Sequence, residues 1–556
     1  MKKIINDTGS AVDDMLEGLV TVNSKLALVE GQRIVVDAAL QSSKSQVAVI
    51  SGGGAGHEPA HAGYVGSGML AAAVSGDVFT SPSVDAILEG IRAFRGGPGV
   101  VLIVKNYTGD RLNFSLAAEI ARSEGIATEV VMVADDVAID MEHSAVGARG
   151  IAGTVFVHKV AGAAAARGLP VGEVARLGRL AASRIGTMGV GLTPCTVPAA
   201  GKAGFSLGDN EIELGLGIHG EAGVSKSEVK SSRELVEALL STVISRRAIE
   251  PGSHVALLVN GLGGTPPMEL AIATRDALDY LAEQKIIVKR AWTGTLLTAL
   301  EMAGMSLTLM MLDDELLGYI DDATSAPAWP SLDGRVSMSK RHIAATQQSA
   351  EWIASDSRII RSVLTSVANS LIAQSQRLND LDQIVGDGDI GISLRRGSEA
   401  ILADLDSYPL ANPQDLGRAL SATLRKSLGG SSGPLYAIFM LRAAEALAAG
   451  DIAAAFSAGV AGISQVGGAK VGDRTMVDAL EPAADAFETA VREGKDVSEA
   501  MVEAIAAAEK GTTYTATLTA RLGRSSYLGE RALGVADPGA EAVVVWLKAI
   551  LNGMKK

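Results

Sequence analysis

The chain has 556 residues, and 49 lysines and arginines against 63 aspartates and glutamates give a formal net charge of −14. No basic excess is available to neutralise phosphates, which argues against a nucleic-acid partner. The one cysteine, Cys195, excludes an intrachain disulfide framework and multi-cysteine metal clusters. No uninterrupted apolar stretch of about 18 residues occurs, so we expect no membrane span and a reducing, cytoplasmic compartment.

Short apolar runs alternate with amphipathic stretches over roughly the first 320 residues. Helix-like segments such as 234–246 separate many of the runs. Alternation of this kind predicts a parallel or mixed sheet covered by helices, and therefore an α/β fold. The strand-length runs lie at 47–50, 100–104, 130–133, 255–259, 286–288 and 307–312.

Polar loops that contain glycine follow three strand-like runs. They cover residues 51–59, 105–110 and 217–221. In open α/β sheets, ligands bind beyond the carboxyl ends of the strands. We therefore expect these three loops to form one candidate site.

The composition and the hydrophobic pattern of the chain change near residues 322–342. Two prolines, Pro327 and Pro330, stand among small residues there and indicate a linker. Beyond it, alanine-rich stretches at 453–461 and 502–508 favour helices, and strand signals nearly vanish. We expect the C-terminal 200 or so residues to be all-α. The clearest helical spacing is that of Ile360, Val363, Leu364, Val367 and Leu371.

Three aspartates, Asp382, Asp387 and Asp389, lie at positions i, i+5 and i+7. If a helix ends near Val385, the glycines that follow let the chain turn and the three carboxylates converge. Clustered like charges repel unless a cation is present, and hard oxygen ligands suit Mg²⁺. An EF-hand loop counted from Asp387 would need glutamate where Ser398 stands. The alternative of a solvated acidic turn stays open.

Two glycine-rich loops lie between helical segments, at 429–433 and 467–478. Glycines let backbone N–H groups approach an anion, and the serines of the first loop add donors at a helix start. Ordinary helix–helix turns, with Asp473 as an N-cap in the second loop, are the alternative. The segment 537–539 indicates a turn.

Two common nucleotide motifs are missing or weak. The Walker A pattern is absent, so any nucleotide would need another cradle. Gly215, Gly217 and Gly220 match the spacing of a dinucleotide fingerprint. The acidic residue expected about 20 residues later is missing, because the helix-like segment 234–246 occupies that region. These observations disfavour a Rossmann interpretation.

Two of the seven histidines, His57 and His219, lie in glycine-rich loops after strands. A neutral imidazole can attack the carbon of a ketone or aldehyde, which is a candidate role for His219. His57 with Asp110 and Lys105 could form an acid–base and hydroxyl-binding set. The remaining histidines are expected to be capped or core residues: His61, His143, His158, His254 and His342.

Together these motifs resemble the dihydroxyacetone kinase family over nearly the whole chain. The resemblance in the first half is carried by residues 51–61, 76–79, 105–110 and 217–221. In the second half it is carried by residues 385–389, 429–433, 472–476 and 523–527. So many matches in the same order make coincidence implausible.

The resemblance implies the ATP-dependent single-chain form of the family. Its α/β K domain, residues 1–325, would have two α/β subdomains, at about 1–185 and 186–325. A linker at 326–342 would join it to an all-α helical-barrel L domain at 343–556. The family phosphorylates short ketoses with ATP and Mg²⁺, and dihydroxyacetone is expected first, erythrulose second. A homodimer would place one subunit's L domain against the partner's K domain.

The resemblance also assigns roles to residues. His219 would hold the substrate as a covalent hemiaminal, Asp110 would take the proton from the attacking hydroxyl, and His57 would assist. Mg²⁺ would be bound by Asp382, Asp387 and Asp389. The substrate would be lined by Gly53, Gly54, Ala55, Gly56 and Lys105. ATP would be bound by Gly391, Ile392, Ser393, Ser431, Ser432, Gly468, Met476, Asp537, Pro538 and Gly539.

Some positions depart from the family pattern, namely Ile390, Pro434, Val471 and the segment 141–144. Ile390 and Pro434 keep a rival interpretation open, a carbonyl-sugar sensor or coregulator that transfers no phosphate. A nucleotide lyase or cyclase that uses the L domain alone is a third interpretation.

Overall fold

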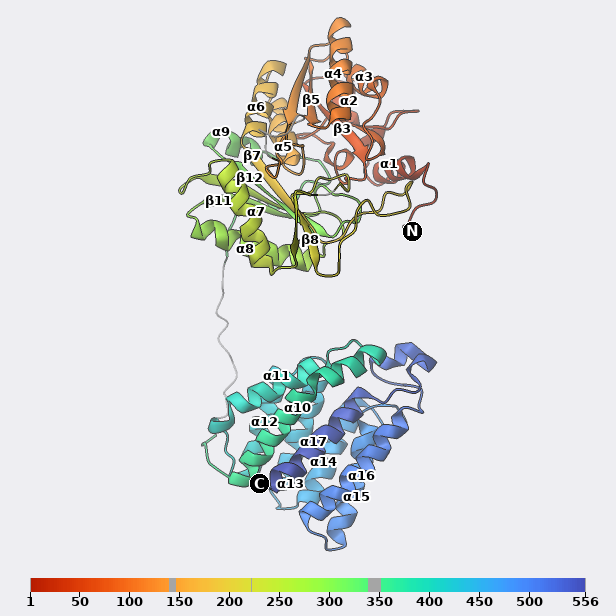
Figure 1. Ribbon diagram of the computed structural model, residues 1–556, viewed down its shortest axis with the longest axis vertical. Coiled ribbons are helices and arrows are strands. Elements are labelled where there is room, and N and C mark those ends of the chain that lie inside the picture. The colour runs from red at the N-terminus through yellow and green to blue at the C-terminus, as the bar shows by residue number, and fades with distance from the viewer. Residues whose placement is uncertain (1, 140–146, 222, 339–351, 556) are drawn as a thin grey trace. The chain divides into compact units, whose positions relative to one another are not determined.

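The computed structural model describes residues 2–139, 147–221, 223–338 and 352–555. They form two compact units, Met1–Arg341 and His342–Lys556 (Figure 1). No helix in the described ranges is both long and apolar enough to cross a membrane. The departing segment 141–144, His143 and His342 lie outside the described residues.

The first unit contains two six-stranded sheets. The first has the order β1-β2-β4-β3-β5-β6; the pairs among β3, β4, β5 and β6 are parallel, and β1 and β2 pair antiparallel. The strands are β1 (Leu26–Leu28), β2 (Ile34–Asp37), β3 (Ala48–Ala55), β4 (Ala72–Val78), β5 (Val100–Lys105) and β6 (Thr128–Val133).

Helices cover both faces of this sheet. One layer is α3 (Val84–Arg92) and α4 (Thr108–Ser123), and the other is α5 (Thr154–Ala166) and α6 (Val171–Ser183). Helix α5 is buried on nearly all sides, as expected of a helix that is apolar all round. The smaller elements are α1 (Ala11–Thr21), α2 (Ala38–Ser43) and η1 (Ala62–Tyr64).

The second sheet has the order β11-β10-β12-β7-β8-β9, and only its β10–β11 pair is parallel. Helices α7 (Ser232–Arg246) and α8 (Pro267–Glu283) pack on one face (Figure 1). The strands are β7 (Ile185–Gly191), β8 (Glu211–Leu214), β9 (Ser225–Glu228), β10 (His254–Gly261), β11 (Ile287–Gly294) and β12 (Gly304–Met311), followed by α9 (Asp314–Ile320).

The predicted alternation of strands and helices is confirmed. All six predicted runs overlap a strand, and the helix-like segment 234–246 lies within α7. Strands β4 and β7 escaped prediction because glycine, serine and alanine interrupt their apolar pattern. The glycines at 215–220 lead into β9 instead of a helix, so no helix N-terminus is available there for a pyrophosphate.

The two sheets share one apolar core. Val101 of β5, Phe156 of α5 and Leu258 of β10 belong to the same buried cluster. The first residues of the expected linker join it, because Ala326 is buried and the Trp329 ring centroid lies 5.0 Å from that of Trp292. The segment 326–329 therefore packs on the first unit.

The second unit is a ring of helices, and no strand occurs among its described residues, 352–555. Each long helix packs on its neighbours in sequence, and α17 packs on α10, which closes the ring. The predicted all-α barrel is thus confirmed. An apolar cavity of about 470 Å³ lies within it. The helices are α10 (Arg358–Val385), α11 (Ile390–Ala403), α12 (Pro413–Ser427), α13 (Ser432–Leu447), α14 (Ile452–Gly467), α15 (Val477–Arg492), α16 (Val497–Thr515) and α17 (Pro538–Met554), with the 3₁₀ helices η2 (Leu405–Ser407) and η3 (Arg524–Ala532).

Replacing Gly162 with alanine is expected to destabilise the first unit. Gly162 lies on α5, and a Cβ atom there would overlap the backbone of Met69. Overpacking of this kind costs about 1–3 kcal/mol, so we expect a lower thermal midpoint. The matched control is Gly18→Ala in α1, where a Cβ meets open space and a stabilisation of about 0.5–1 kcal/mol is expected. Equal midpoints for the two variants would contradict the packing of α5.

Candidate active site

The carboxyl end of β3 carries the first group of predicted site residues, Gly53, Gly54 and Ala55. Gly53 leaves space for the Lys105 ammonium group, because a Cβ atom at this position would lie 2.7 Å from Lys105 Nζ and 3.5 Å from Asp110 Oδ2. The absent side chain therefore lets β3 lie directly against these two ionisable groups. Gly56 follows the strand, and its N–H donates to the carboxylate of Glu58.

Lys105 ends β5, and Asp110 lies in the first turn of α4. Their side chains are only 1% and 5% exposed, and Lys105 Nζ lies 4.0 Å from Asp110 Oδ2. Lys105 also donates to His61 Nε2 at 2.6 Å. Burial lowers the pKa of Lys105, and the opposite charges of Asp110 and Asp135 act against this decrease.

His61 and His158, which were expected to be capped or core residues, extend the contact of Lys105 by hydrogen bonds. Because Lys105 donates to His61 Nε2, the proton of His61 is on Nδ1. That N–H donates to His158 Nε2 at 2.9 Å. Both histidines are buried, as expected, but they also form a chain that ends on the lysine. Sequence reasoning missed this role, although His61 belongs to the same loop as His57.

His57 is fully buried behind the end of β3. Its Nδ1–H donates to the carbonyl of Thr298 at 2.8 Å, so Nε2 carries a lone pair. Nε2 has no hydrogen-bond partner among the described residues. Burial, then the charges of His219 and Lys105, hold the pKa of His57 well below its usual range. The imidazole is therefore neutral and offers an acceptor to a hydroxyl group.

His219 lies in the loop after β8, next to His57. Its ring centroid is 4.8 Å from that of His57 and 4.4 Å from that of Tyr107. Burial lowers the pKa of His219, while the neighbouring Glu221 acts in the opposite direction. A neutral imidazole in this position can attack an electrophilic carbon.

An aromatic side chain that sequence reasoning missed completes this cluster. The ring of Phe79 stacks on His57 at 5.0 Å and meets the edge of His219 at 5.3 Å. The first unit thus brings all its predicted catalytic and substrate residues together at the ends of β3 and β5.

The three aspartates of the second unit also converge. One carboxylate oxygen from each of Asp382, Asp387 and Asp389 lies within 4.8 Å of the other two. Asp382 Oδ2 accepts from the backbone N–H of Asp389 at 3.0 Å, which folds the loop back onto α10. Carboxylate oxygens at this spacing fit a hard divalent cation such as Mg²⁺.

The first turn of α11 adjoins this cluster and contains Gly391, Ile392 and Ser393. Asn379, which sequence reasoning missed as a site residue, accepts from the N–H groups of Gly391 and Ile392 at 2.7 and 3.1 Å. The loop at 429–433 lies beside this turn, since a Cβ on Gly429 would be 4.0 Å from Ser393 Oγ. In that loop Ser431 is the N-cap of α13, and Ser432 is its first residue.

The other predicted nucleotide residues lie at neighbouring helix ends. Gly468 is the C-cap residue that follows α14, and Met476 precedes α15. Met476 lies beside the turn at 537–539, because a Cβ on Gly539 would be 3.4 Å from its Cβ. Asp537 caps α17, with Pro538 in the first turn. Burial raises the pKa of Asp537 to about 6, while the Ala540 N–H and the charge of Arg474 act in the opposite direction.

Comparisons with known proteins cover both units. A model described as the Dak1 domain matches residues 17–328, and one described as the DAK2 domain matches residues 384–552. The chain is 42% identical over 571 residues to triokinase/FMN cyclase of Homo sapiens, covering 99% of each protein. It is 38% identical over 563 residues to the dihydroxyacetone kinase of Citrobacter freundii, covering 98% of each.

A solved structure matches the same extent of the chain. The crystal structure of the C. freundii dihydroxyacetone kinase in complex with AMP-PNP and Mg²⁺ superimposes with a TM-score of 0.66 and 35% identity. The match covers 99% of each chain. Because both domains are matched in order on one polypeptide, the chain belongs to the dihydroxyacetone kinase family, in its single-chain form.

Proposed function

We propose that this protein transfers the terminal phosphoryl group of ATP to dihydroxyacetone. The observation that carries the proposal is the pair of neutral imidazoles, His57 and His219, beside the buried Lys105–Asp110 pair. The first unit supplies groups for a small ketone with hydroxyl groups, and the second supplies groups for a metal-bound triphosphate. Full-length relatives that are named as dihydroxyacetone kinase and triokinase support the same reaction.

In the capture step, a nitrogen of His219 adds to the carbonyl carbon of the ketose. A C–N bond forms, the C=O double bond becomes a C–O single bond, and the oxygen takes the proton that the imidazole ring loses. This hemiaminal requires a neutral imidazole, which burial of His219 favours. Glycerol has no carbonyl group and is not captured in this way.

In the transfer step, the terminal hydroxyl oxygen of the captured ketose forms a bond to the terminal phosphorus of ATP, and the bond from that phosphorus to the oxygen of the departing ADP breaks. Asp110 accepts the hydroxyl proton, His57 Nε2 accepts a hydrogen bond from the substrate, and the Lys105 ammonium lies 4.0 Å from the Asp110 carboxylate. Asp382, Asp387 and Asp389 would hold Mg²⁺, which neutralises charge on the triphosphate. The first turn of α11 and the serines at 431–432 would bind phosphate through N–H and O–H groups.

The sensor interpretation is not favoured. Ile390 and Pro434, the two residues on which it rests, are compatible with a second unit that binds metal and nucleotide. Ile390 donates its backbone N–H to Asp382, and its side chain packs against the barrel core. Pro434 lies in the first turn of α13, where the missing N–H of proline costs no helical hydrogen bond. Erythrulose remains the second substrate candidate, and initial rates with C3 and C4 ketoses decide between them.

The name of the human relative includes FMN cyclase, which bears on the lyase or cyclase interpretation of the second unit. Incubation with FAD and a divalent metal, without ketose, tests this interpretation by detection of cyclic FMN.

A homodimer and a cytoplasmic location remain predictions. The single cysteine supports a reducing compartment, and light scattering measures the oligomeric state.

Replacing His219 with alanine is expected to lower kcat/KM for dihydroxyacetone by at least about 100-fold, because capture positions the reacting hydroxyl. A coupled assay for ADP release measures this change. The matched control is His254→Ala, which changes an exposed histidine at the start of β10. Kinetics of the His219 variant equal to those of wild type would refute the covalent role.

The KM for dihydroxyacetone is expected to stay constant from pH 8 down past the usual histidine pKa of about 6.5. Burial lowers the pKa values of His57 and His219, so both rings keep their lone pairs until the solution is more acidic. Below that point protonation removes the lone pairs and KM rises. A rise in KM centred at or above pH 6.5, in protein that circular dichroism shows to be folded, would contradict this account.

Replacing Asp387 with asparagine is expected to weaken metal binding at least about 10-fold, since it removes one of three charged oxygen donors. Calorimetric titration with Mg²⁺ or Mn²⁺ in the presence of a non-hydrolysable ATP analogue measures the affinity. The control is Asp380→Asn, two residues before Asp382, because Asp380 is exposed and accepts from Gln376. Equal metal affinity in the two variants would remove Asp387 from the ligand set.

A further inference from the structure

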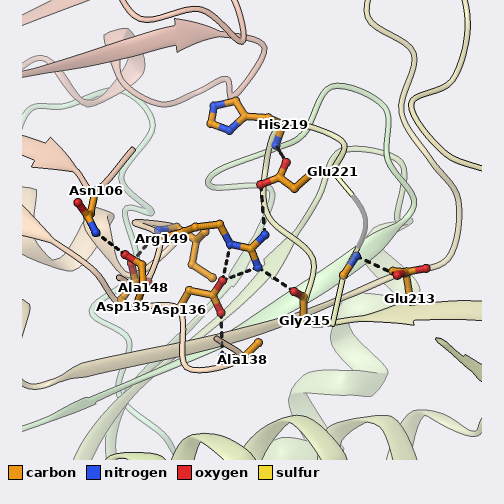
Figure 2. A network of polar contacts seen from close by, with 12 residues as sticks. Asn106, Asp135, Asp136, Ala138, Ala148, Arg149, Glu213, Gly215, His219 and Glu221 are labelled. Atoms are coloured by element: carbon orange, nitrogen blue, oxygen red, sulfur yellow. Dashed lines mark hydrogen bonds and ion pairs between the residues drawn. The ribbon is translucent and has the colours of Figure 1, made fainter. Parts of the chain in front are cut away.

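The loop that carries His219 has little structure of its own to hold it. Residues 215–221 lie between β8 and β9, and three of them, Gly215, Gly217 and Gly220, are glycines. The position of the His219 ring must therefore be fixed by contacts from outside the loop. The ring itself packs on His57, Phe79 and Tyr107. Figure 2 shows the polar contacts that hold the backbone of the loop, which centre on Arg149 and its two acidic partners, Asp136 and Glu221.

Arg149 contacts the His219 loop at two points. Its Nη2 donates to the carbonyl of Gly215 at 2.8 Å, and its Nη1 donates to Glu221 Oε1 at 3.3 Å. Glu221 Oε2 in turn accepts the backbone N–H of His219 at 2.8 Å. The guanidinium therefore holds the start of the loop directly and His219 through one carboxylate. Gly217 lies against this pair, since a Cβ atom there would collide with Glu221.

Arg149 is itself fixed to the segment that follows β6, where Asp136 pairs with Thr187 of β7. Its Nε and Nη2 lie 2.8 and 2.6 Å from Asp136 Oδ2, and the Asp136 side chain is only 1% exposed. The carbonyl of the preceding residue, Ala148, accepts from Asn106 at 2.8 Å. Asn106 directly follows Lys105, so residues 148–149 connect the carboxyl end of β5 to the His219 loop. In Figure 2 the His219 ring points away from Glu221, which leaves the ring free of this network.

We propose that Arg149 is a positioning residue that fixes His219 relative to Lys105 and Asp110, with Glu221 as the link. The proposal rests on the proposed function, in which His219 captures the ketose and Asp110 activates its hydroxyl. Arg149 touches neither substrate nor nucleotide in this scheme. Its loss displaces the capturing imidazole and leaves the second unit, with its metal and nucleotide groups, unchanged.

The test is a separation of ketose capture from ATP use in the full chain. Arg149→Met is expected to raise KM for dihydroxyacetone about 100-fold, the effect of a displacement of about 1 Å at a reacting group. The value of kcat is lowered less, and KM for ATP is unchanged. Arg149→Lys keeps the charge but cannot bridge all three acceptors, so its KM is intermediate. Calorimetric binding of dihydroxyacetone follows the same order.

The matched control is Arg290→Met. Arg290 is on β11, is 13% exposed against 15% for Arg149, and likewise donates Nε and Nη2 to one aspartate, Asp321. Its loss removes a comparable ion pair without affecting the His219 loop, so its KM for the ketose stays at the wild-type value. Thermal midpoints of all variants show which proteins are folded.

If Arg149→Met does not fold, Glu221→Gln decides the question. This variant keeps the shape and an acceptor oxygen but loses the charge that pairs with Arg149, so we expect a higher KM for dihydroxyacetone. A wild-type KM in either folded variant overturns the proposal, and so does a KM for ATP that rises in parallel with that for the ketose. Wild-type protein that neither binds nor phosphorylates any short ketose would instead overturn the proposed function.

Discussion

The chemistry of the first unit depends on one buried ammonium group, that of Lys105. Moving an unpaired charge out of water costs several kcal/mol. Here the charge has the carboxylate of Asp110 at 4.0 Å, the imidazole of His61 at 2.6 Å and the carbonyl of Gly52 at 3.4 Å. These contacts offset the loss of solvent and hold the lysine at the end of β5.

The same cation acts on every histidine near it. Burial and the charge of Lys105 together lower the pKa of His57, His61, His158 and His219, and that of His158 falls to about 3. Four imidazoles are therefore neutral at physiological pH. Two of them orient the lysine, and the other two present lone pairs beside it. The site therefore holds one cation, Lys105, and the neutral imidazoles around it can accept hydrogen bonds or, at His219, attack a carbon.

Much of this arrangement could be predicted from sequence, because simple rules apply to the elements that carry it. Loops after β3 and β5 meet because the carboxyl ends of neighbouring parallel strands lie at one edge of a sheet. The aspartate cluster follows from a helix end and two glycines, and the roles of the nucleotide residues stay predictions. Two departures from the family pattern, Ile390 and Pro434, required the structure before their packing could be understood.

Contacts between distant segments could not be predicted in this way. His61 bonds to His158, 97 residues away, and no local pattern in the sequence indicates that pairing. Arg149 does not follow a recognisable strand-like run, and its role depends on its contacts with Asp136 and Glu221. Phe79 lies within a motif that was recognised, and Asn379 lies three residues before Asp382, but their roles as a ring contact and a helix cap come from packing.

The measurement that tests the central claim most directly is the ¹³C NMR spectrum of dihydroxyacetone labelled at the carbonyl carbon and mixed with the protein. The account predicts a new protein-bound signal from tetrahedral carbon, distinct from that of the free hydrate and absent with His219→Ala. A bound ketose whose labelled carbon retains its carbonyl resonance would contradict capture by a neutral His219.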